Sequence, residues 1–283
     1  MSRGAALAAA ALLVAGCSQF TAVDGTPVAA LARPILLMHR GCGNDPDYRQ
    51  NTLECMRYGA GLYDGAEADL QLSDDGTIWL SHDNEVYDCA GAQVGCFQGM
   101  SDAQLDAVAE CPDGSHYVRL SAVFQAFSAE PPLLSKIVAL DVKDQLCGSL
   151  GFSEAKEMAG ALDLLVRSYH MDWRLLVESD QDTFMDRFHD LGTPTYLFVE
   201  GYGGIDPIIA DADRQHATGI SYRYFNAPYE RSLTDGLRNV GLRTMVWPVD
   251  DPAVIPPIWA MHPDVIETDL SDFYAYVPAP APF

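Results

Sequence analysis

The sequence predicts an α/β protein built as a single (β/α)8 (TIM) barrel, on three observations. Short apolar runs alternate with stretches of helical character from Ile35 onward, a pattern that favours parallel strands joined by helices. Eight such runs can be counted when Thr77–His82 is taken as the returning arm of a hairpin, and eight parallel strands close a barrel. The 283 residues are 48% hydrophobic, which is enough for one large core.

The first predicted strand is the continuous apolar run Pro34–Met38, as expected of a strand buried on both faces. It ends in His39-Arg40-Gly41, and a helix capped by Asn51 or Thr52 follows to about Tyr58. The later apolar runs are Ile137–Lys143, Leu175–Ser179, Thr195–Val199, Thr218–Tyr222, Leu242–Trp247 and Val265–Asp269. Helical stretches lie at Ser153–Ser168, Gln181–Asp190, Pro228–Asn239 and Pro252–Ala260. We find no internal repeat and no second domain, so residues 34–275 are expected to form one domain.

The second strand is predicted as one arm of a hairpin spanning Gly65–Asp83. Alternating apolar and polar residues flank Ser-Asp-Asp-Gly, a tight turn in which Gly76 is free to take a positive φ. Folding about this turn brings His82 close to Glu67 and Asp69, whose carboxylates share one face of the strand. Such oxygen ligands suit a hard cation, and an imidazole beside it suits proton transfer near neutral pH. The alternative is a solvated strand face.

The charge balance restricts the partners of the chain. Seventeen basic residues against forty acidic ones give a formal net charge of −23, which speaks against a broad surface for nucleic acid or anionic membranes. An anionic substrate therefore requires a localised site with a metal ion and a few basic side chains.

The N-terminus has the character of an export signal. A basic start and a short apolar run from Ala5 to Ala15 precede Val14-Ala15-Gly16-Cys17, which resembles the bacterial lipobox. We expect residues 1–16 to be cleaved, Cys17 to be lipidated and residues 17–33 to form a tether, which places the protein in the bacterial cell envelope, periplasmic or outer-membrane. The alternative is an ordinary cleaved signal with a chance cysteine. Residues 276–283 are expected to form a loose tail.

Cysteine usage supports export. Removing Cys17 from the seven cysteines leaves six, an even number that favours disulfides in an exported chain. The six are Cys42, Cys55, Cys89, Cys96, Cys111 and Cys147. Fifteen pairings are possible. We expect Cys89 to pair with Cys96, its nearest neighbour, and Cys42 with Cys55, which flanks the same strand-to-helix connection.

Five motifs together resemble the glycerophosphodiester phosphodiesterase family in order, spacing and residue type. They are His39-Arg40-Gly41, Asn51-Thr52-Leu53, Glu67-Ala68-Asp69, Ser73-Asp74-Asp75-Gly76 and His82-Asp83. The later apolar runs resemble, more loosely, the third to eighth barrel strands of that family, with Asp141 and Lys143 ending the third and Trp247 ending the seventh. The resemblance implies a barrel whose mouth carries a metal-dependent phosphodiesterase site.

The resemblance also implies a role for each site residue. Glu67, Asp69 and Asp141 hold one Mg²⁺ or Ca²⁺, and His39 and His82 act as general acid and base. Two further residues, Arg40 and Lys143, grip the phosphate of a small phosphodiester, and Trp247 lines the pocket. The alternatives are structural roles. The acids would cap helices or lie on the surface, and the two histidines would have all their hydrogen bonds satisfied within the fold. The two cations would form ion pairs, and the tryptophan would pack in the core.

The long insert from Asp83 to about Ser135 contains three of the cysteines and a helical stretch at Ser121–Ser128. In the family such a segment lies over the barrel mouth and helps to choose the substrate. The alternative is an insert that only stabilises the fold and is cross-linked by disulfides.

Two departures from the family pattern bear on function. Gln50 replaces a glutamate, and Asp141 replaces the usual glutamate of the third strand. An aspartate two residues before a lysine also occurs in the related spider-venom phospholipase D toxins, which share a small disulfide loop after the second histidine. The leading hypothesis is hydrolysis of glycerophosphodiesters by a monomer. The alternatives are phospholipase D-like cleavage of sphingomyelin or lysophospholipids, and a non-catalytic surface lipoprotein that binds phosphodiesters.

Overall fold

The computed structural model describes residues 27–278 except 113, 143–144, 147, 150–151, 180–181, 202–203 and 227–229. Several predictions fall outside the described residues. They concern the signal peptide, the lipidated Cys17, the first part of the tether, the phosphate-binding Lys143, Cys147 and the end of the tail.

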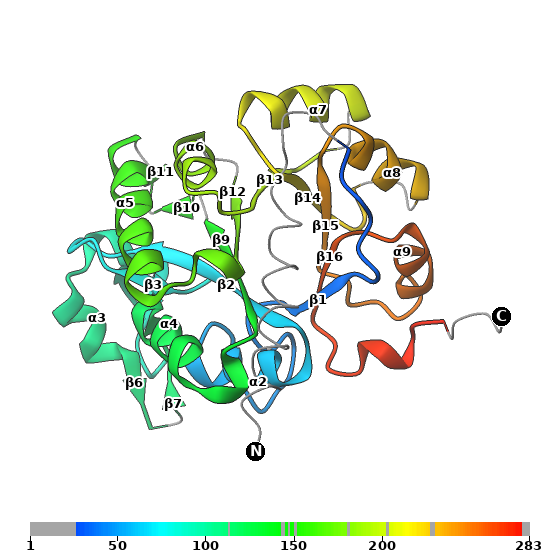
Figure 1. The fold of residues 1–283 in the computed structure, drawn as a ribbon. Coiled ribbons are helices and arrows are strands. Elements are labelled where there is room, and N and C mark those ends of the chain that lie inside the picture. Colours follow the sequence, from blue (N-terminus) through cyan, green and yellow to red (C-terminus); the bar gives the residue numbers. More distant parts are fainter. Residues whose placement is uncertain are drawn as a thin grey trace, which may run out of the picture.

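Eight parallel strands form a closed barrel, as predicted (Figure 1). The barrel closes because β1 pairs with β2 on one side and with β16, the last strand, on the other. In sheet order the strands are β1 (Ile35–Met38), β2 (Gly65–Leu72), β9 (Ile137–Val142), β12 (Leu175–Ser179), β13 (Thr195–Val199), β14 (Gly219–Arg223), β15 (Arg243–Trp247) and β16 (Val265–Thr268).

Helices surround the barrel and cover the outer faces of its strands (Figure 1). They are α2 (Leu53–Leu62), α4 (Leu120–Ala129), α5 (Phe152–Tyr169), α6 (Asp182–Asp190), α7 (Ile205–Arg214), α8 (Arg231–Asn239) and α9 (Ile255–Met261). Short 3₁₀ turns lie at Phe97–Gly99, Pro131–Leu133, Asp172–Arg174 and Phe273–Ala275. Thr52 caps α2, because its side-chain oxygen accepts a hydrogen bond from the backbone N–H of Cys55. Helix α7 was not expected from the sequence.

Two apolar layers hold the barrel. The smaller one fills its interior with Leu37, Ala139, Leu176, Tyr196, Met245, Trp247 and Val265. The larger one packs the outward-facing strand residues against the helices, with Leu36, Val138, Phe184 and Ile266 all fully buried. A barrel filled in this way is a packed core and leaves its mouth for chemistry.

The predicted hairpin is present. Strand β3 (Ile78–Leu80) runs antiparallel to β2, and Leu70 lies opposite Leu80. In the turn, Gly76 has φ +76° and its N–H donates to the carbonyl of Ser73. This register places Ser81 beside Asp69, since the N–H of Ser81 donates to the Asp69 carbonyl at 3.1 Å.

The insert has a small core of its own beside the barrel (Figure 1). It contains β4 (Glu85–Tyr87), β5 (Gln93–Cys96), α3 (Asp102–Ala109), β6 (Glu110–Cys111), β7 (Gly114–Ser115) and β8 (Val118–Arg119), and β8 pairs with β3. Asp102 ties the insert to the hairpin by accepting hydrogen bonds from Ser73, Thr77 and Trp79. A short hairpin, β10 (Gln145–Leu146) and β11 (Gly148–Ser149), follows β9.

The disulfides agree with the sequence in part. Cys42 is joined to Cys55, as expected. The expected pairing of Cys89 with Cys96 is wrong, because Cys89 is joined to Cys111. Helix α3 and β6 turn the chain back so that the Cα atoms of Cys89 and Cys111 lie 5.5 Å apart, although 22 positions separate them. Cys96 is also disulfide-bonded.

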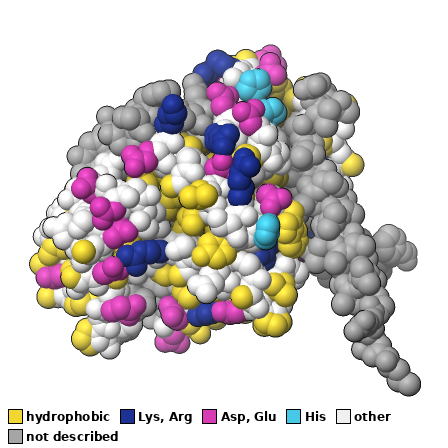
Figure 2. All heavy atoms as spheres, turned by 60° about the vertical axis from the view of Figure 1, so that its left-hand side comes forward, with side chains coloured by type: hydrophobic (Ala, Val, Ile, Leu, Met, Phe, Trp, Pro, Cys, Tyr) yellow, Lys and Arg dark blue, Asp and Glu magenta, His cyan; other side chains and the backbone are white. Residues whose placement is uncertain are grey.

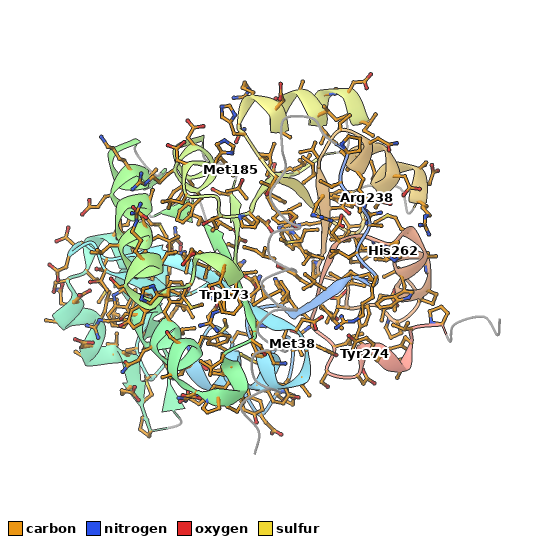
Figure 3. The ribbon with its side chains drawn as sticks, in the orientation of Figure 1. Met38, Trp173, Met185, Arg238, His262 and Tyr274 are labelled. Atoms are coloured by element: carbon orange, nitrogen blue, oxygen red, sulfur yellow. A yellow bond between two sulfur atoms is a disulfide. The ribbon has the colours of Figure 1, made fainter. Side chains whose placement is uncertain are left out.

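The amino-terminal segment contacts the barrel opposite its mouth. The N–H of Val28 donates to the carbonyl of Arg238, and Arg243 donates to the carbonyl of Ala29. Arg238 and Arg243 share the fully buried Asp264, and Arg238 also donates to the carbonyl of His262, which lies next to it in Figure 3. The described part of the predicted tether is therefore held against the barrel.

On the face shown in Figure 2, basic and acidic side chains are interspersed. No helix among the described residues is both long enough and apolar enough to cross a membrane.

Candidate active site

The strand order brings the predicted site residues to one end of the barrel. Glu67 and Asp69 lie on β2, and Asp141 lies near the end of β9, the next strand. His39 directly follows β1, and Trp247 ends β15. Because parallel strands end at the same mouth, residues far apart in sequence become neighbours here.

Three carboxylates form a candidate cation site. One oxygen each from Glu67, Asp69 and Asp141 lies within 4.8 Å of the others. Asp69 and Asp141 are direct partners in the β2–β9 register, and the Glu67 and Asp69 side chains are buried. Buried carboxylates at this spacing require positive charge, and three hard oxygen donors fit Mg²⁺ or Ca²⁺.

Arg40 and Asn51 fix the positions of these acids. The N–H of Arg40 donates to Glu67 Oε2 at 2.7 Å, and Arg40 Nε lies 3.6 Å from Asp69 Oδ2. The Asn51 amide donates to Asp69 Oδ2 at 2.8 Å, while its oxygen accepts from the Asp69 N–H at 3.0 Å. Arg40 and Asn51 both have left-handed backbone angles, φ +53° and +60°, a strain often found at functional sites.

Gln50 supports the same loop with an uncharged side chain. Its oxygen accepts from Arg40 at 3.3 Å, and its amide donates to the carbonyl of Gly43 at 2.7 Å. Gly43 has φ +58°, and a Cβ atom there would lie 2.3 Å from the backbone oxygen of Asp269. The loop therefore packs directly against the residue that follows β16.

His39 is buried and oriented by Asp269. Its Nδ1 lies 2.8 Å from Asp269 Oδ1, and Asp269 Oδ2 accepts from Asn44 at 3.1 Å. With the Nδ1 hydrogen directed to the carboxylate, the neutral imidazole presents Nε2 as a proton acceptor. His39 also lies near the acids, since one of its ring nitrogens is within 4.8 Å of ligand oxygens from Glu67 and Glu267.

His82 has the same kind of support in a more open position. Its Nδ1 lies 2.7 Å from Asp83 Oδ1, and about a third of its side chain is exposed. It lines a pocket of about 480 Å³ together with Arg40 and Asn51, both of which contact Asp69. This volume suits a small ligand.

The insert supplies another wall of that pocket. Tyr87, His116 and Tyr117 line it together with residues of the β1–α2 loop. The Tyr117 hydroxyl accepts from the N–H of Tyr87 at 2.9 Å, which fixes the two tyrosines relative to each other. The insert therefore shares the pocket with His82.

Trp247 lies beside His39, with ring centroids 6.1 Å apart and the rings stacked. Its indole N–H donates to Ser221 Oγ at 2.7 Å, and Ser221 donates to Glu178 Oε2 at 2.8 Å. The guanidinium of Arg223 lies over the ring of Trp247, 5.1 Å from its centroid. Lys143, the other predicted phosphate ligand, lies outside the described residues.

Sequence reasoning did not identify Glu178, Glu267 and Asp269 as part of this region. Glu178 and Glu267 each interrupt an apolar strand, and that interruption was the available signal. Burial raises the pKa of Glu267 well above its ordinary value, and neighbouring carboxylates, Glu67 first, raise it further.

Comparison with known proteins agrees with this geometry. The chain matches the glycerophosphoryl diester phosphodiesterase family over residues 39–272. No curated protein sequence matches it.

Solved structures share the fold at low identity. A glycerophosphodiester phosphodiesterase from Parabacteroides distasonis is 18% identical, with a TM-score of 0.70 and coverage of 88% of this chain and 95% of that one. The enzyme from Thermotoga maritima is 22% identical, with a TM-score of 0.66 and coverage of 87% and 98%. An Oleispira antarctica phosphodiesterase, solved with its product sn-glycerol-3-phosphate, is 13% identical, with a TM-score of 0.68 and coverage of 86% and 96%.

The family match spans the β1 motif, the hairpin and every later strand of the barrel, including the carboxylates and both histidines. This chain therefore belongs to the glycerophosphoryl diester phosphodiesterase family and is a phosphoric diester hydrolase.

Proposed function

We propose that the protein hydrolyses glycerophosphodiesters to glycerol 3-phosphate and an alcohol, using one divalent cation and two histidines. The observation that carries the proposal is the cluster of Glu67, Asp69 and Asp141, with ligand oxygens within 4.8 Å, at the barrel mouth that also holds His39. The product found in the Oleispira antarctica structure, sn-glycerol-3-phosphate, supports this substrate class.

The three carboxylates are assigned to one Mg²⁺ or Ca²⁺. Bound there, the cation would polarise a phosphoryl oxygen and offset the charge that develops on it. The Asn51 amide and the Arg40 N–H keep the Asp69 and Glu67 carboxylates in place, because each donates a hydrogen bond to one of them.

His39 and His82 are assigned to proton transfer. The Nδ1 atom of His39 lies against Asp269 and that of His82 against Asp83, which leaves Nε2 of each ring for proton transfer. One imidazole takes the proton from the attacking glycerol hydroxyl of the substrate, and the other protonates the leaving oxygen of the alcohol; water then opens the cyclic phosphate to give glycerol 3-phosphate. Arg40 and Lys143 are assigned to the phosphate, Arg40 through its forked guanidinium and Lys143 as a point charge.

The test is release of free alcohol from glycerophosphocholine. We expect His39→Ala and His82→Ala each to remove most turnover, and EDTA to abolish turnover until Mg²⁺ or Ca²⁺ is added back. His170→Ala is the matched control, because His170 is exposed on the chain after α5, and it should retain full turnover. Unchanged rates in the two site variants would count against the assignment.

One observation that favoured the phospholipase D-like alternative, the small disulfide loop expected from the sequence, is not found among the residues that the structure describes. That loop was expected after the second histidine, and Cys89 is joined to Cys111 instead of Cys96. Assaying sphingomyelin, lysophosphatidylcholine and glycerophosphocholine side by side distinguishes the two activities. Preference for either lipid would overturn the proposed substrate class.

We also propose that the protein is exported and anchored in the bacterial cell envelope through a lipid on Cys17. The lipobox-like sequence supports this, as do the disulfides Cys42–Cys55 and Cys89–Cys111, which persist in oxidising compartments. Mass spectrometry of the mature amino terminus tests it. A Cys17→Ala variant should lose the lipid and leave the membrane fraction, whereas an unmodified wild-type Cys17 would contradict the proposal.

A further inference from the structure

The barrel mouth holds a second group of potential metal ligands. Beside the cluster of Glu67, Asp69 and Asp141 lies a second one, in which one ligand atom each from His39, Glu67 and Glu267 lies within 4.8 Å of the others. The two clusters share Glu67. The residues of the second cluster are buried, with relative exposures of 7%, 2% and 2%.

Glu267 points to a missing partner at this second cluster. Its Oε1 is buried and receives no hydrogen bond from any described residue. Its surroundings are acidic, since Glu67, Glu178, Asp141 and Asp69 all act on it electrostatically. A buried carboxylate without a donor is costly unless a cation or a proton satisfies it.

The ligand types differ between the clusters. Nδ1 of His39 is held by Asp269 at 2.8 Å, so Nε2 is the nitrogen left to bind an ion. One imidazole nitrogen with two carboxylates is a ligand set typical of Zn²⁺, whereas three carboxylates favour Mg²⁺ or Ca²⁺. A carboxylate that orients the imidazole from its other nitrogen, as Asp269 does, is also typical of zinc sites.

We propose that His39, Glu67 and Glu267 form a second metal site that binds Zn²⁺, and that the bound ion inhibits turnover by occupying His39 Nε2. The inhibition rests on the proposed role of His39 in proton transfer, because the same nitrogen cannot hold a metal ion and accept a proton. The binding itself does not depend on that role.

The experiment measures metal content and inhibition separately. The holoprotein is dialysed against micromolar zinc with excess magnesium, and zinc and magnesium per chain are determined by elemental analysis. We expect the wild type to hold zinc in addition to its first cation. Glu267→Gln, which keeps the shape and removes the charge, should weaken zinc binding by roughly tenfold or more. Zinc inhibition of glycerophosphocholine turnover should weaken by the same factor.

Glu178→Gln is the matched control, since Glu178 is another buried glutamate of the barrel and is bonded to Ser221. This variant should keep the zinc ion at the second site. The proposal is overturned if Glu267→Gln binds zinc as tightly as the wild type, if Glu178→Gln loses it equally, or if zinc merely replaces the first cation. A protein that binds zinc through Glu267 but cleaves no glycerophosphodiester would overturn the proposed function and leave the metal site standing.

Discussion

His39 Nδ1 lies 2.8 Å from Asp269 Oδ1, a contact between residues 230 positions apart that exists only because β16 closes the barrel beside β1. The carboxylate selects the tautomer of the imidazole and fixes its orientation. Asp269 is therefore a positioning residue for the proposed acid or base.

Replacing Asp269 by asparagine should lower kcat by about 10²- to 10⁴-fold, because the amide can hold the wrong tautomer. KM should change little, and the pH profile of kcat should shift. Steady-state assays of glycerophosphocholine across pH check this. Asn44→Ala removes only the 3.1 Å hydrogen bond to Asp269 Oδ2 and should cost far less. Equal, small losses in both variants would argue against a positioning role for Asp269.

The double hydrogen bond between Asn51 and Asp69 leads to a second prediction. Losing the bond from the Asn51 amide to Oδ2 removes a donor that orients the Asp69 carboxylate, so half-saturation by Mg²⁺ or Ca²⁺ should require about 10- to 100-fold more metal in Asn51→Ala. Because Asn51 has φ +60°, alanine there is also strained. Asn51→Gly removes that strain. If the side chain matters, both variants should show the same shift in metal titrations of turnover; normal metal dependence in Asn51→Gly would assign the effect to the backbone.

The strands were largely predictable because strands of a parallel barrel are buried on both faces. Leu175–Ser179 and Thr195–Val199 have the predicted bounds, since short, mainly apolar runs mark them. Helix α7 was missed because Gly203-Gly204 and Pro207 suggest a loop. Pro207 is tolerated as the third residue of α7, within the first turn, where the backbone N–H groups have no partner inside the helix.

The site residues that lie close together in sequence were predictable, and those that only the closed barrel brings together were not. Glu67 and Asp69 share a strand face, and a hairpin turn fixes His82 relative to them, so short-range geometry was sufficient. Asp269 and Glu267 join the site only through barrel closure. The disulfide of Cys89 depended likewise on the path of α3 and β6, which no local pattern specified.

The disulfide Cys42–Cys55 closes the loop that carries Asn51 and begins two residues after Arg40, and Cys55 Sγ lies 3.0 Å from the Arg40 carbonyl oxygen. Replacing both cysteines by alanine should lower the free energy of unfolding by about 2–4 kcal/mol and also raise the metal concentration needed for half-saturation. The matched variant replaces Cys89 and Cys111 in the insert; it should lose stability without changing metal dependence. Urea denaturation and metal titration measure the two effects, and identical metal dependence in both variants would contradict this prediction.

Asp163 links α5 to α6 by accepting hydrogen bonds from Arg167, at 2.7 Å, and from Arg187. Burial raises the pKa of its carboxyl, but the two guanidinium groups outweigh burial and hold that pKa below its ordinary value. Because the folded-state pKa is depressed, the contribution to stability is present above the unfolded value and is lost as pH falls through the folded one. Asp163→Asn should therefore lower the free energy of unfolding by about 1–3 kcal/mol at pH near 7. This difference from the wild type should disappear at acidic pH. Urea denaturation at both pH values checks this, with the exposed Asp213→Asn as a control that should show no such difference. If the difference in free energy of unfolding between Asp163→Asn and the wild type persists unchanged at acidic pH, then the shape of the Asp163 side chain, and not its charge, holds the two helices together.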